Sequence, residues 1–183
     1  MNEFPVELAR VIKMVIIDVD GVMTDGGLYM GITPQGDPLE MKRFEITDGL
    51  GVKMLSWSGL HVHVVSGRAS HANRVRAREL EVPYREAHGG FKVRVVDELR
   101  RASQLEWSQV CCIGDDLADL PIMQQVGLPV SVANGVPEIK AAAKWTTVRK
   151  GGDGAVRELS EALLKARGEW DHLVDNYCRE RGI

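Results

Sequence analysis

The segment VIIDVDGVMTD, residues 15–25, constrains the fold of this chain more than any other part of it. Its β-branched residues predict a short buried strand, and two acidic residues, Asp18 and Asp20, follow directly. Side chains two residues apart on an extended segment point the same way, so both carboxylates can face the crevice where open α/β folds bind ligands. Gly21 lets the backbone turn away from them. The sequence therefore predicts an anionic site at the end of this strand.

The chemistry of two such carboxylates favours a cation between them. Both are ionised near neutral pH and repel each other. Oxygen ligands of this kind suit Mg²⁺, which binds through one or two carboxylates and keeps positions for water and phosphate. An ionised aspartate is also a nucleophile that needs no auxiliary base, and the second carboxylate remains free for proton transfer. The alternative is an Asp-rich turn without a function, which is common after a strand.

Composition limits the classes of protein to consider. The chain has 183 residues, of which 44% are hydrophobic and 27% charged, and this balance is typical of one globular domain over residues 1–183. Its net charge is -3 and its basic residues are scattered, which argues against a nucleic-acid platform. No apolar run is long enough to span a membrane, and the N-terminus lacks the apolar core of a signal peptide. A cytoplasmic protein is expected.

The rest of the chain alternates between strand and helix patterns. Turn residues flanked by alternating apolar residues predict a β-hairpin over residues 27–46, and a helix should follow with Asp48 as its N-cap and Gly59 as its end. A polar helical tail is expected over residues 169–183. The remaining predicted strands lie near residues 62–66, 82–86, 110–113, 128–132 and 145–148, and the remaining helices near residues 70–80, 90–102, 136–143 and 155–168.

Two further predicted strands end in polar residues, as the first one does. This alternation predicts an α/β fold with a doubly wound, mainly parallel sheet, in which the carboxyl ends of the strands meet at one edge. Groups that are distant in sequence can then form a single site. The strand near residues 62–66 ends in Ser66, Gly67 and Arg68. The strand near residues 110–113 is followed by Asp115, Asp116 and Asp119.

The order of these motifs resembles that of the haloacid dehalogenase (HAD) superfamily phosphatases. The four motifs of that superfamily have counterparts here in the same order along the chain: DVDGVMTD, SGR, Lys92 and GDDLADL. DGLGVKML and GGDGAVRE are similar, in addition, to segments of its small sugar-acid phosphatases. The resemblance covers nearly the whole chain and implies a Rossmann-like sheet with a β-hairpin insertion and no cap domain.

The resemblance also implies catalytic and metal-binding roles. Asp18 would attack phosphorus and form an aspartyl-phosphate, and Asp20 would act first as the acid and then as the base. Mg²⁺ would be held by the side chains of Asp18 and Asp115 and by the backbone carbonyl of Asp20. Asp116 and Asp119 would orient the metal-binding groups without binding the metal themselves.

Further residues would bind the substrate. Ser66 and the amide of Gly67 would hold phosphate oxygens, Arg68 would lie beside them, and Lys92 would neutralise the charge of the transferred group. Arg157 is a candidate for contacting a substrate carboxylate across a subunit boundary; the alternative is a surface charge near a helix start.

The substrate implied is a phosphorylated sugar acid, with 3-deoxy-D-manno-octulosonate 8-phosphate (KDO 8-phosphate) first and a nonulosonate 9-phosphate (KDN or N-acetylneuraminate) second. Thr47 and Asp153 stand where octulosonate phosphatases usually carry arginine, whereas Arg68 stands where the nonulosonate enzymes often carry glutamate. Members of this subgroup form homotetramers in which the hairpin takes part and a neighbouring subunit covers the active site, and they serve lipopolysaccharide biosynthesis. A non-catalytic, oligomerising or regulatory relative is the alternative of another class.

Overall fold

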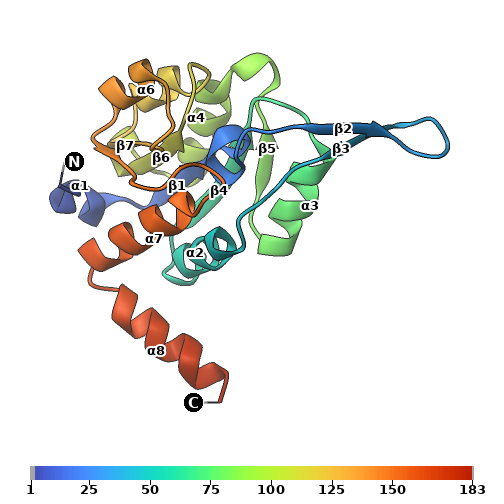
Figure 1. Cartoon of the computed structure of the whole chain (residues 1–183). Coiled ribbons are helices and arrows are strands. Elements are labelled where there is room, and N and C mark those ends of the chain that lie inside the picture. Colours follow the sequence, from blue (N-terminus) through green and yellow to red (C-terminus); the bar gives the residue numbers. More distant parts are fainter. Residues whose placement is uncertain (1–2, 183) are drawn as a thin grey trace.

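A computed structural model describes residues 3–182 and shows a six-stranded parallel sheet between two layers of helices (Figure 1). The strand order is β5-β4-β1-β6-β7-β8, and every neighbouring pair in it is parallel. The prediction of a doubly wound α/β sheet is therefore confirmed. The strands are β1 (Met14–Ile17), β4 (His61–Ser66), β5 (Tyr84–Glu86), β6 (Val110–Gly114), β7 (Leu128–Ser131) and β8 (Trp145–Thr146).

The central strand β1 contributes to both faces of the sheet. Val15 and Ile17 belong to one apolar cluster, and Met14 and Ile16 belong to the other, because alternate side chains of a strand point to opposite faces. The first cluster is covered by α1 (Val6–Val11), α2 (Ile46–Trp57), α3 (His71–Leu80) and α7 (Ala155–Ala166), and the second by α4 (Lys92–Ala102), α5 (Leu120–Met123) and α6 (Pro137–Ala142).

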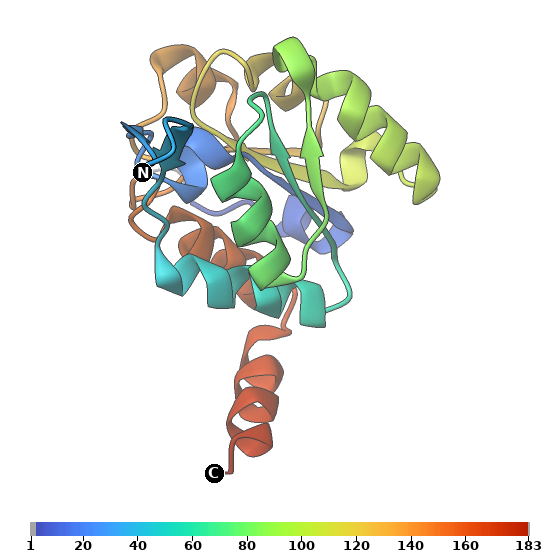
Figure 2. The same ribbon diagram turned by 90° about the vertical axis from the view of Figure 1, so that its right-hand side faces the viewer.

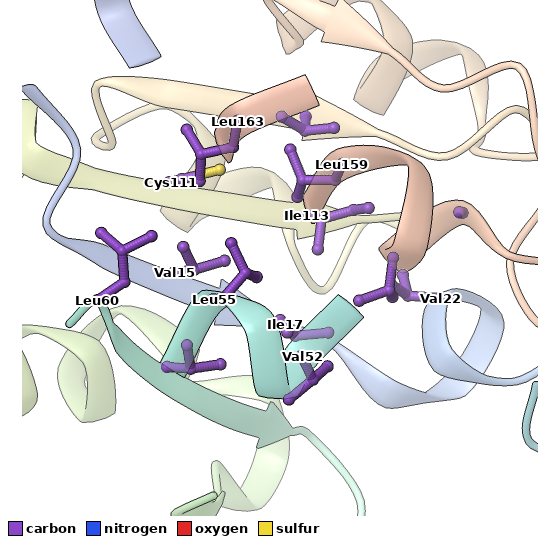
Figure 3. Packing of buried hydrophobic residues seen from close by; sticks show 14 of the residues in the cluster. Val15, Ile17, Val22, Val52, Leu55, Leu60, Cys111, Ile113, Leu159 and Leu163 are labelled. Carbon is purple, nitrogen blue, oxygen red and sulfur yellow. The ribbon is translucent and has the colours of Figure 1, made fainter. Parts of the chain in front are cut away.

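Helices α2 and α7 pack side by side on the first face (Figures 1 and 3). Leu55 from α2 and Leu159 from α7 are fully buried above Ile17 and Ile113 of the sheet. Burying one such side chain stabilises the fold by about 1.5–3 kcal/mol. Apolar packing therefore holds the two helices against the sheet, and α7 also contacts the segment Val19–Met23 that follows β1.

The predicted hairpin is present and stands apart from the main sheet. Strands β2 (Tyr29–Ile32) and β3 (Pro38–Met41) form a separate antiparallel pair that projects from the body of the molecule in Figure 1 and points toward the viewer in Figure 2. An isolated bridge between Thr24 and Phe44 closes its base. The hairpin is thus shorter than predicted at its C-terminal end, since Ile46 is already the first residue of α2.

The predicted N-cap of α2 is wrong. The cap is Glu45, whose carboxylate accepts a hydrogen bond from the Thr47 amide at 3.3 Å. Asp48 caps a different helix, because its Oδ1 accepts the Arg157 amide at 2.7 Å in the first turn of α7. The N-cap of α7 itself is Gly154, which has no side chain for this purpose.

We expect the pH dependence of stability to reveal this capping contact. Burial raises the pKa of Asp48 to about 6, and its Oδ2 has no hydrogen-bond partner. A folded-state pKa above the unfolded value penalises the ionised form, so this residue's contribution to the free energy of unfolding should improve as the pH falls from about 6 to 4. In Asp48→Asn, urea unfolding at pH 7 and pH 4.5 should show less of this improvement than in the wild type.

The Asp48→Ala variant separates capping from charge. Its free energy of unfolding should be about 1 kcal/mol lower than that of Asp48→Asn, because asparagine keeps the acceptor for the Arg157 amide and alanine does not. Equal stability of the two variants at both pH values would contradict the capping role.

Other boundaries differ modestly from the predictions. Helix α1 was not predicted, and α4 begins at Lys92 rather than Gly90 because a short turn over His88–Gly90 precedes it. Helix α8 (Trp170–Glu180) lies within the predicted tail, whose last residue is outside the described part of the chain, and extends away from the sheet (Figure 1). Within residues 3–182, none of the helices has the length and apolar character needed to cross a membrane.

Candidate active site

A buried lysine joins two carboxylates at the carboxyl edge of the sheet. Lys92 Nζ donates to Asp18 Oδ1 and to Asp119 Oδ1, both at 2.6 Å. All three side chains are almost inaccessible, with 4%, 7% and 2% exposed. They arrive from the start of α4, the end of β1 and the residue before α5, so three separate elements converge here.

The turn after β1 is held by Thr24. Its hydroxyl donates to the Val19 carbonyl at 3.2 Å and accepts the amides of Gly21 and Gly26 at 3.3 and 3.2 Å. Gly21 adopts φ +89°, and a Cβ there would collide with the Asp115 carboxylate. The turn therefore lets the chain leave the strand while Asp18, Asp20 and Asp115 stay close to one cavity.

The end of β4 supplies hydroxyl, amide and guanidinium groups. Ser66 is buried, and its hydroxyl donates to the Arg68 carbonyl at 3.0 Å, which keeps the loop tight around Gly67. The Arg68 guanidinium pairs with Glu40 of β3 at 2.5 Å. Arg68 is thereby tied to the base of the hairpin at the rim of the cavity.

The end of β6 supplies the remaining acidic residues. Asp119 is buried, and its second oxygen accepts the Asp115 amide at 3.2 Å. Asp116 is exposed and accepts the Leu117 amide at 2.7 Å. Asp115 and Asp119 therefore face inward together, whereas the Asp116 side chain is tied to its own loop.

The electrostatics of this site call for a further cation. Burial raises the pKa of Asp18, the Asp119 carboxylate raises it further, and Lys92 opposes both effects. Burial, with the carboxylates of Asp119 and Asp116, raises the pKa of Asp115 to about 7. Burial disfavours the charge on Lys92, yet Asp18 and Asp119 outweigh it and raise the pKa of this lysine. One ammonium group among three carboxylates leaves negative charge that is not compensated.

These residues fit a hard divalent cation. One carboxylate oxygen each from Asp18, Asp115 and Asp119 lie within 4.8 Å of one another, and all the candidate ligands are oxygens. A bound cation would stabilise the ionised carboxylates and reverse the rise in their pKa values. The donor set suits Mg²⁺.

Nearly all the residues predicted for the site line one cavity of about 380 Å³. Arg157 is the exception, because it lies on a second cavity of about 300 Å³ together with Thr47 and Arg149. Its guanidinium donates to Glu161 at 2.7 Å and stacks over Trp170. The residues that the first cavity brings together are Asp18, Asp20, Ser66, Gly67, Arg68, Lys92, Asp115, Asp116 and Asp119.

Comparison with known proteins places the chain in a family. A model of the haloacid dehalogenase-like hydrolases matches residues 87–159. The 3-deoxy-D-manno-octulosonate 8-phosphate phosphatase KdsC of Yersinia pestis is 40% identical over 162 residues, which are 88% of this chain and 84% of that protein. This chain belongs to the haloacid dehalogenase-like hydrolases. The KdsC protein of Escherichia coli K12 is also similar, with 34% identity over 89% of this chain and 85% of its own length.

Solved structures of this hydrolase family share the fold. The octulosonate phosphatase of Moraxella catarrhalis, solved with a magnesium ion, a phosphate ion and KDO, matches with a TM-score of 0.87 and 33% identity over 94% of this chain and 97% of that one. The Yersinia pestis enzyme matches with a TM-score of 0.84 and 38% identity over 91% and 88% of the two chains. The resemblance seen in the motifs is therefore confirmed over most of the chain.

We expect Mg²⁺ to stabilise this hydrolase through its acidic cluster. A ligand that binds only the folded state stabilises it by about 2.7 kcal/mol at a hundredfold excess over its Kd, which corresponds to a rise in Tm of about 5–10 °C for a chain of this size. Thermal unfolding with and without Mg²⁺ measures this shift. Asp115→Asn should lose most of it, and Asp37→Asn at the hairpin tip should keep it. A wild-type Tm that does not change on addition of Mg²⁺ would contradict the assignment of a Mg²⁺ site to these carboxylates.

Three residues at this site were not predicted from the sequence. Lys42 donates to Asp20 Oδ1 at 2.6 Å and to Asn73 Oδ1 at 2.9 Å, and Glu40 pairs with Arg68. The sequence carries no local signal for these contacts, because the return path of the hairpin alone brings Lys42 to the end of β1.

Proposed function

We propose that this chain is a Mg²⁺-dependent phosphatase that hydrolyses KDO 8-phosphate to KDO and inorganic phosphate through an aspartyl-phosphate at Asp18. The observation that carries the proposal is the convergence of Asp18, Asp20, Ser66 and Lys92 on one cavity in a chain 40% identical to a KdsC phosphatase. We propose further that residues 1–183 form a single domain of this type and that it works in the cytoplasm, in the supply of KDO for lipopolysaccharide.

In the first step, a carboxylate oxygen of Asp18 forms a bond to phosphorus and the bond from phosphorus to the sugar oxygen breaks. Asp20, which lies two residues further on the same cavity wall, gives its proton to the leaving sugar oxygen. The products of this step are the free sugar acid and an aspartyl-phosphate, and Asp20 is now ionised.

In the second step, a water oxygen attacks the phosphorus of the aspartyl-phosphate. Asp20 takes the proton of that water, and the bond between phosphorus and Asp18 breaks. Inorganic phosphate leaves, and both aspartates return to their starting forms. One carboxyl group thus serves as acid and base in successive half-reactions, as proton balance requires.

The phosphate group is held by residues from β4 and α4. The Gly67 amide offers a donor, and the Ser66 hydroxyl offers a second one by rotating away from the Arg68 carbonyl. Lys92 offers positive charge next to Asp18. A phosphate dianion about 4 Å from a carboxylate is repelled by roughly 4 kcal/mol per charge pair at an effective dielectric near 20. Lys92 and a bound metal ion are therefore needed for the phosphate to enter.

Asp18, Asp115 and the backbone carbonyl of Asp20 would hold Mg²⁺, with Asp119 orienting Asp115 and Lys92. When it is bound, Mg²⁺ polarises the phosphoryl group and neutralises part of its charge.

The identity of the sugar rests on residues at the rim and on the relatives. Arg68 lines the catalytic cavity and offers a planar fork for a carboxylate. Thr47 and Arg157 border the second cavity, so we expect them to contact only a substrate that is bound in the active site of a neighbouring subunit. A nonulosonate 9-phosphate phosphatase remains the second candidate because Thr47 and Asp153 replace arginines of the octulosonate pattern.

We propose that the active form is a homotetramer built partly through the hairpin. Both strands of the hairpin expose apolar side chains, and those of Met30, Ile32 and Met41 are 64%, 77% and 54% exposed. A two-stranded sheet with apolar, unpaired edges is a natural surface for a second copy of the chain. Sedimentation should show a tetramer for the wild type and smaller species for Ile32→Glu; a monomeric wild type would contradict the assembly.

The substrate is tested with a panel of phosphate esters in the presence of Mg²⁺. We expect phosphate release from KDO 8-phosphate to exceed that from KDN 9-phosphate, N-acetylneuraminate 9-phosphate and glucose 6-phosphate by at least about tenfold in kcat/KM. A preference for a nine-carbon substrate would support the second candidate. Release from none of them would remove the phosphatase assignment and favour a non-catalytic, regulatory or oligomerising role.

A further inference from the structure

Lys42, the residue after β3, brings a buried positive charge from the hairpin to the catalytic cavity. Its side chain is fully inaccessible, and its Nζ donates to Asp20 Oδ1 at 2.6 Å and to Asn73 Oδ1 at 2.9 Å. A second acidic neighbour, Glu40, lies 3.7 Å away but is also engaged by Arg68 and by the Ser70 hydroxyl. Asp20 is therefore the closest partner of this ammonium group.

This contact constrains the two oxygens of Asp20 differently. A lysine ammonium group can donate hydrogen bonds but cannot accept them, so Oδ1 of Asp20 is committed as an acceptor. A proton that Asp20 gives or takes must then travel on Oδ2. The Asp20 side chain is 32% exposed, which leaves this second oxygen free to face the cavity.

The contact is part of a continuous buried chain. Asn73, which accepts from Lys42, donates through Nδ2 to the Ser66 hydroxyl at 3.3 Å. The carboxylate expected to move protons and the hydroxyl expected to hold phosphate are thus joined through Lys42 and Asn73. Because one buried lysine spans this gap, the seating of the hairpin base is coupled to the geometry of both groups.

We infer that Lys42 is a positioning residue that holds the Asp20 carboxylate so that Oδ2 faces the leaving-group oxygen and, later, the attacking water. The inference rests on the proposed phosphatase function and adds a hairpin residue to it. Misplacement of a general acid by about 1 Å lowers the rate on the order of 100-fold. Loss of Lys42 should therefore slow the chemical step and leave substrate binding unchanged.

Leaving groups of different basicity distinguish this role from simple structural support. A sugar oxygen needs a proton in order to leave, whereas 4-nitrophenolate leaves without one. In single-turnover measurements with Mg²⁺, Lys42→Met should slow sugar release from KDO 8-phosphate by about 100-fold and 4-nitrophenolate release from 4-nitrophenyl phosphate by less than about threefold. The KM for KDO 8-phosphate should change by less than about threefold.

Arg43→Met is the matched control. It removes a positive charge from the adjacent residue, whose guanidinium donates to the Gly152 carbonyl at 2.7 Å and does not contact Asp20. We expect both substrates to react as in the wild type. If Lys42→Met does not fold, Lys42→Gln offers a polar side chain that is uncharged and one atom shorter than lysine. It cannot hold Asp20 and Asn73 in the same geometry, so it should show the same selective loss.

The outcomes separate the inference from the proposed function. Selective loss with the sugar phosphate and an unchanged KM supports the positioning role. An unchanged rate, an equal loss with both substrates, or a loss confined to KM would overturn it while the wild type remains active. A wild type that releases phosphate from neither substrate would overturn the proposed function and, with it, this role of Lys42.

Discussion

Asp18→Asn is expected to lower phosphate release by at least about 10⁴-fold, a loss comparable to that seen when other enzymes lose their nucleophile. The amide has nearly the same shape as the carboxylate but cannot attack phosphorus. Lys92 keeps its second partner, Asp119, at 2.6 Å, so the fold should be as stable as that of the wild type. Steady-state phosphate release and urea unfolding of the same preparations measure both effects.

The control for this variant is Glu98→Gln, which makes the same change of charge on the exposed surface of α4, away from the hairpin and the cavity. Its activity should equal that of the wild type. An Asp18→Asn protein that is folded and keeps more than about a hundredth of the wild-type rate would rule out Asp18 as the nucleophile.

Lys92→Met is expected to reduce both activity and stability. Lys92 is the cation beside Asp18, and the loss of one electrostatic stabiliser of the transition state costs about 10²- to 10³-fold in kcat. Without the ammonium group, the buried carboxylates of Asp18 and Asp119 face each other unpaired, which should lower the free energy of unfolding by about 3 kcal/mol in the absence of Mg²⁺.

A partly exposed lysine provides the comparison. Lys53 lies on α2, and its side chain is 33% exposed beside Glu81 at 3.6 Å. Lys53→Met should change neither the activity nor the free energy of unfolding by much, because surface ion pairs contribute little to stability. If Lys92→Met were as stable and as active as Lys53→Met, the account of the buried charge cluster would be wrong.

The strand-end motifs were predictable because their signals are local. Asp18 and Asp20 follow a β-branched run, and a parallel sheet brings such ends to one edge, where the structure places them beside Asp115. Lys92 could not be placed by the same reasoning, since a lysine at a helix start is usually exposed. Only its resemblance to a family motif indicated a place in the site, and its burial between Asp18 and Asp119 became evident in the structure.

The contacts that escaped prediction depend on tertiary structure. Asp48 has the sequence signature of an N-cap, yet it caps α7 because Gly154 cannot, and the pairing of α2 with α7 is not visible in either segment alone. Lys42 reaches Asp20 through the return path of an inserted hairpin. Arg157 was expected near the substrate, but within one chain it borders a different cavity, so its predicted contact depends on a neighbouring subunit.

The most direct test of the central claim is to trap the covalent intermediate. Asp20→Asn lacks the base that we propose for hydrolysis of the aspartyl-phosphate, whereas 4-nitrophenyl phosphate needs no acid to form this intermediate. Acid-quenched samples of this variant with Mg²⁺ should show a burst of about one 4-nitrophenolate per subunit, and mass spectrometry should find one phosphoryl group on the peptide that contains Asp18. A burst without a phosphoryl group on Asp18, or steady phosphate release with no burst, would contradict the account.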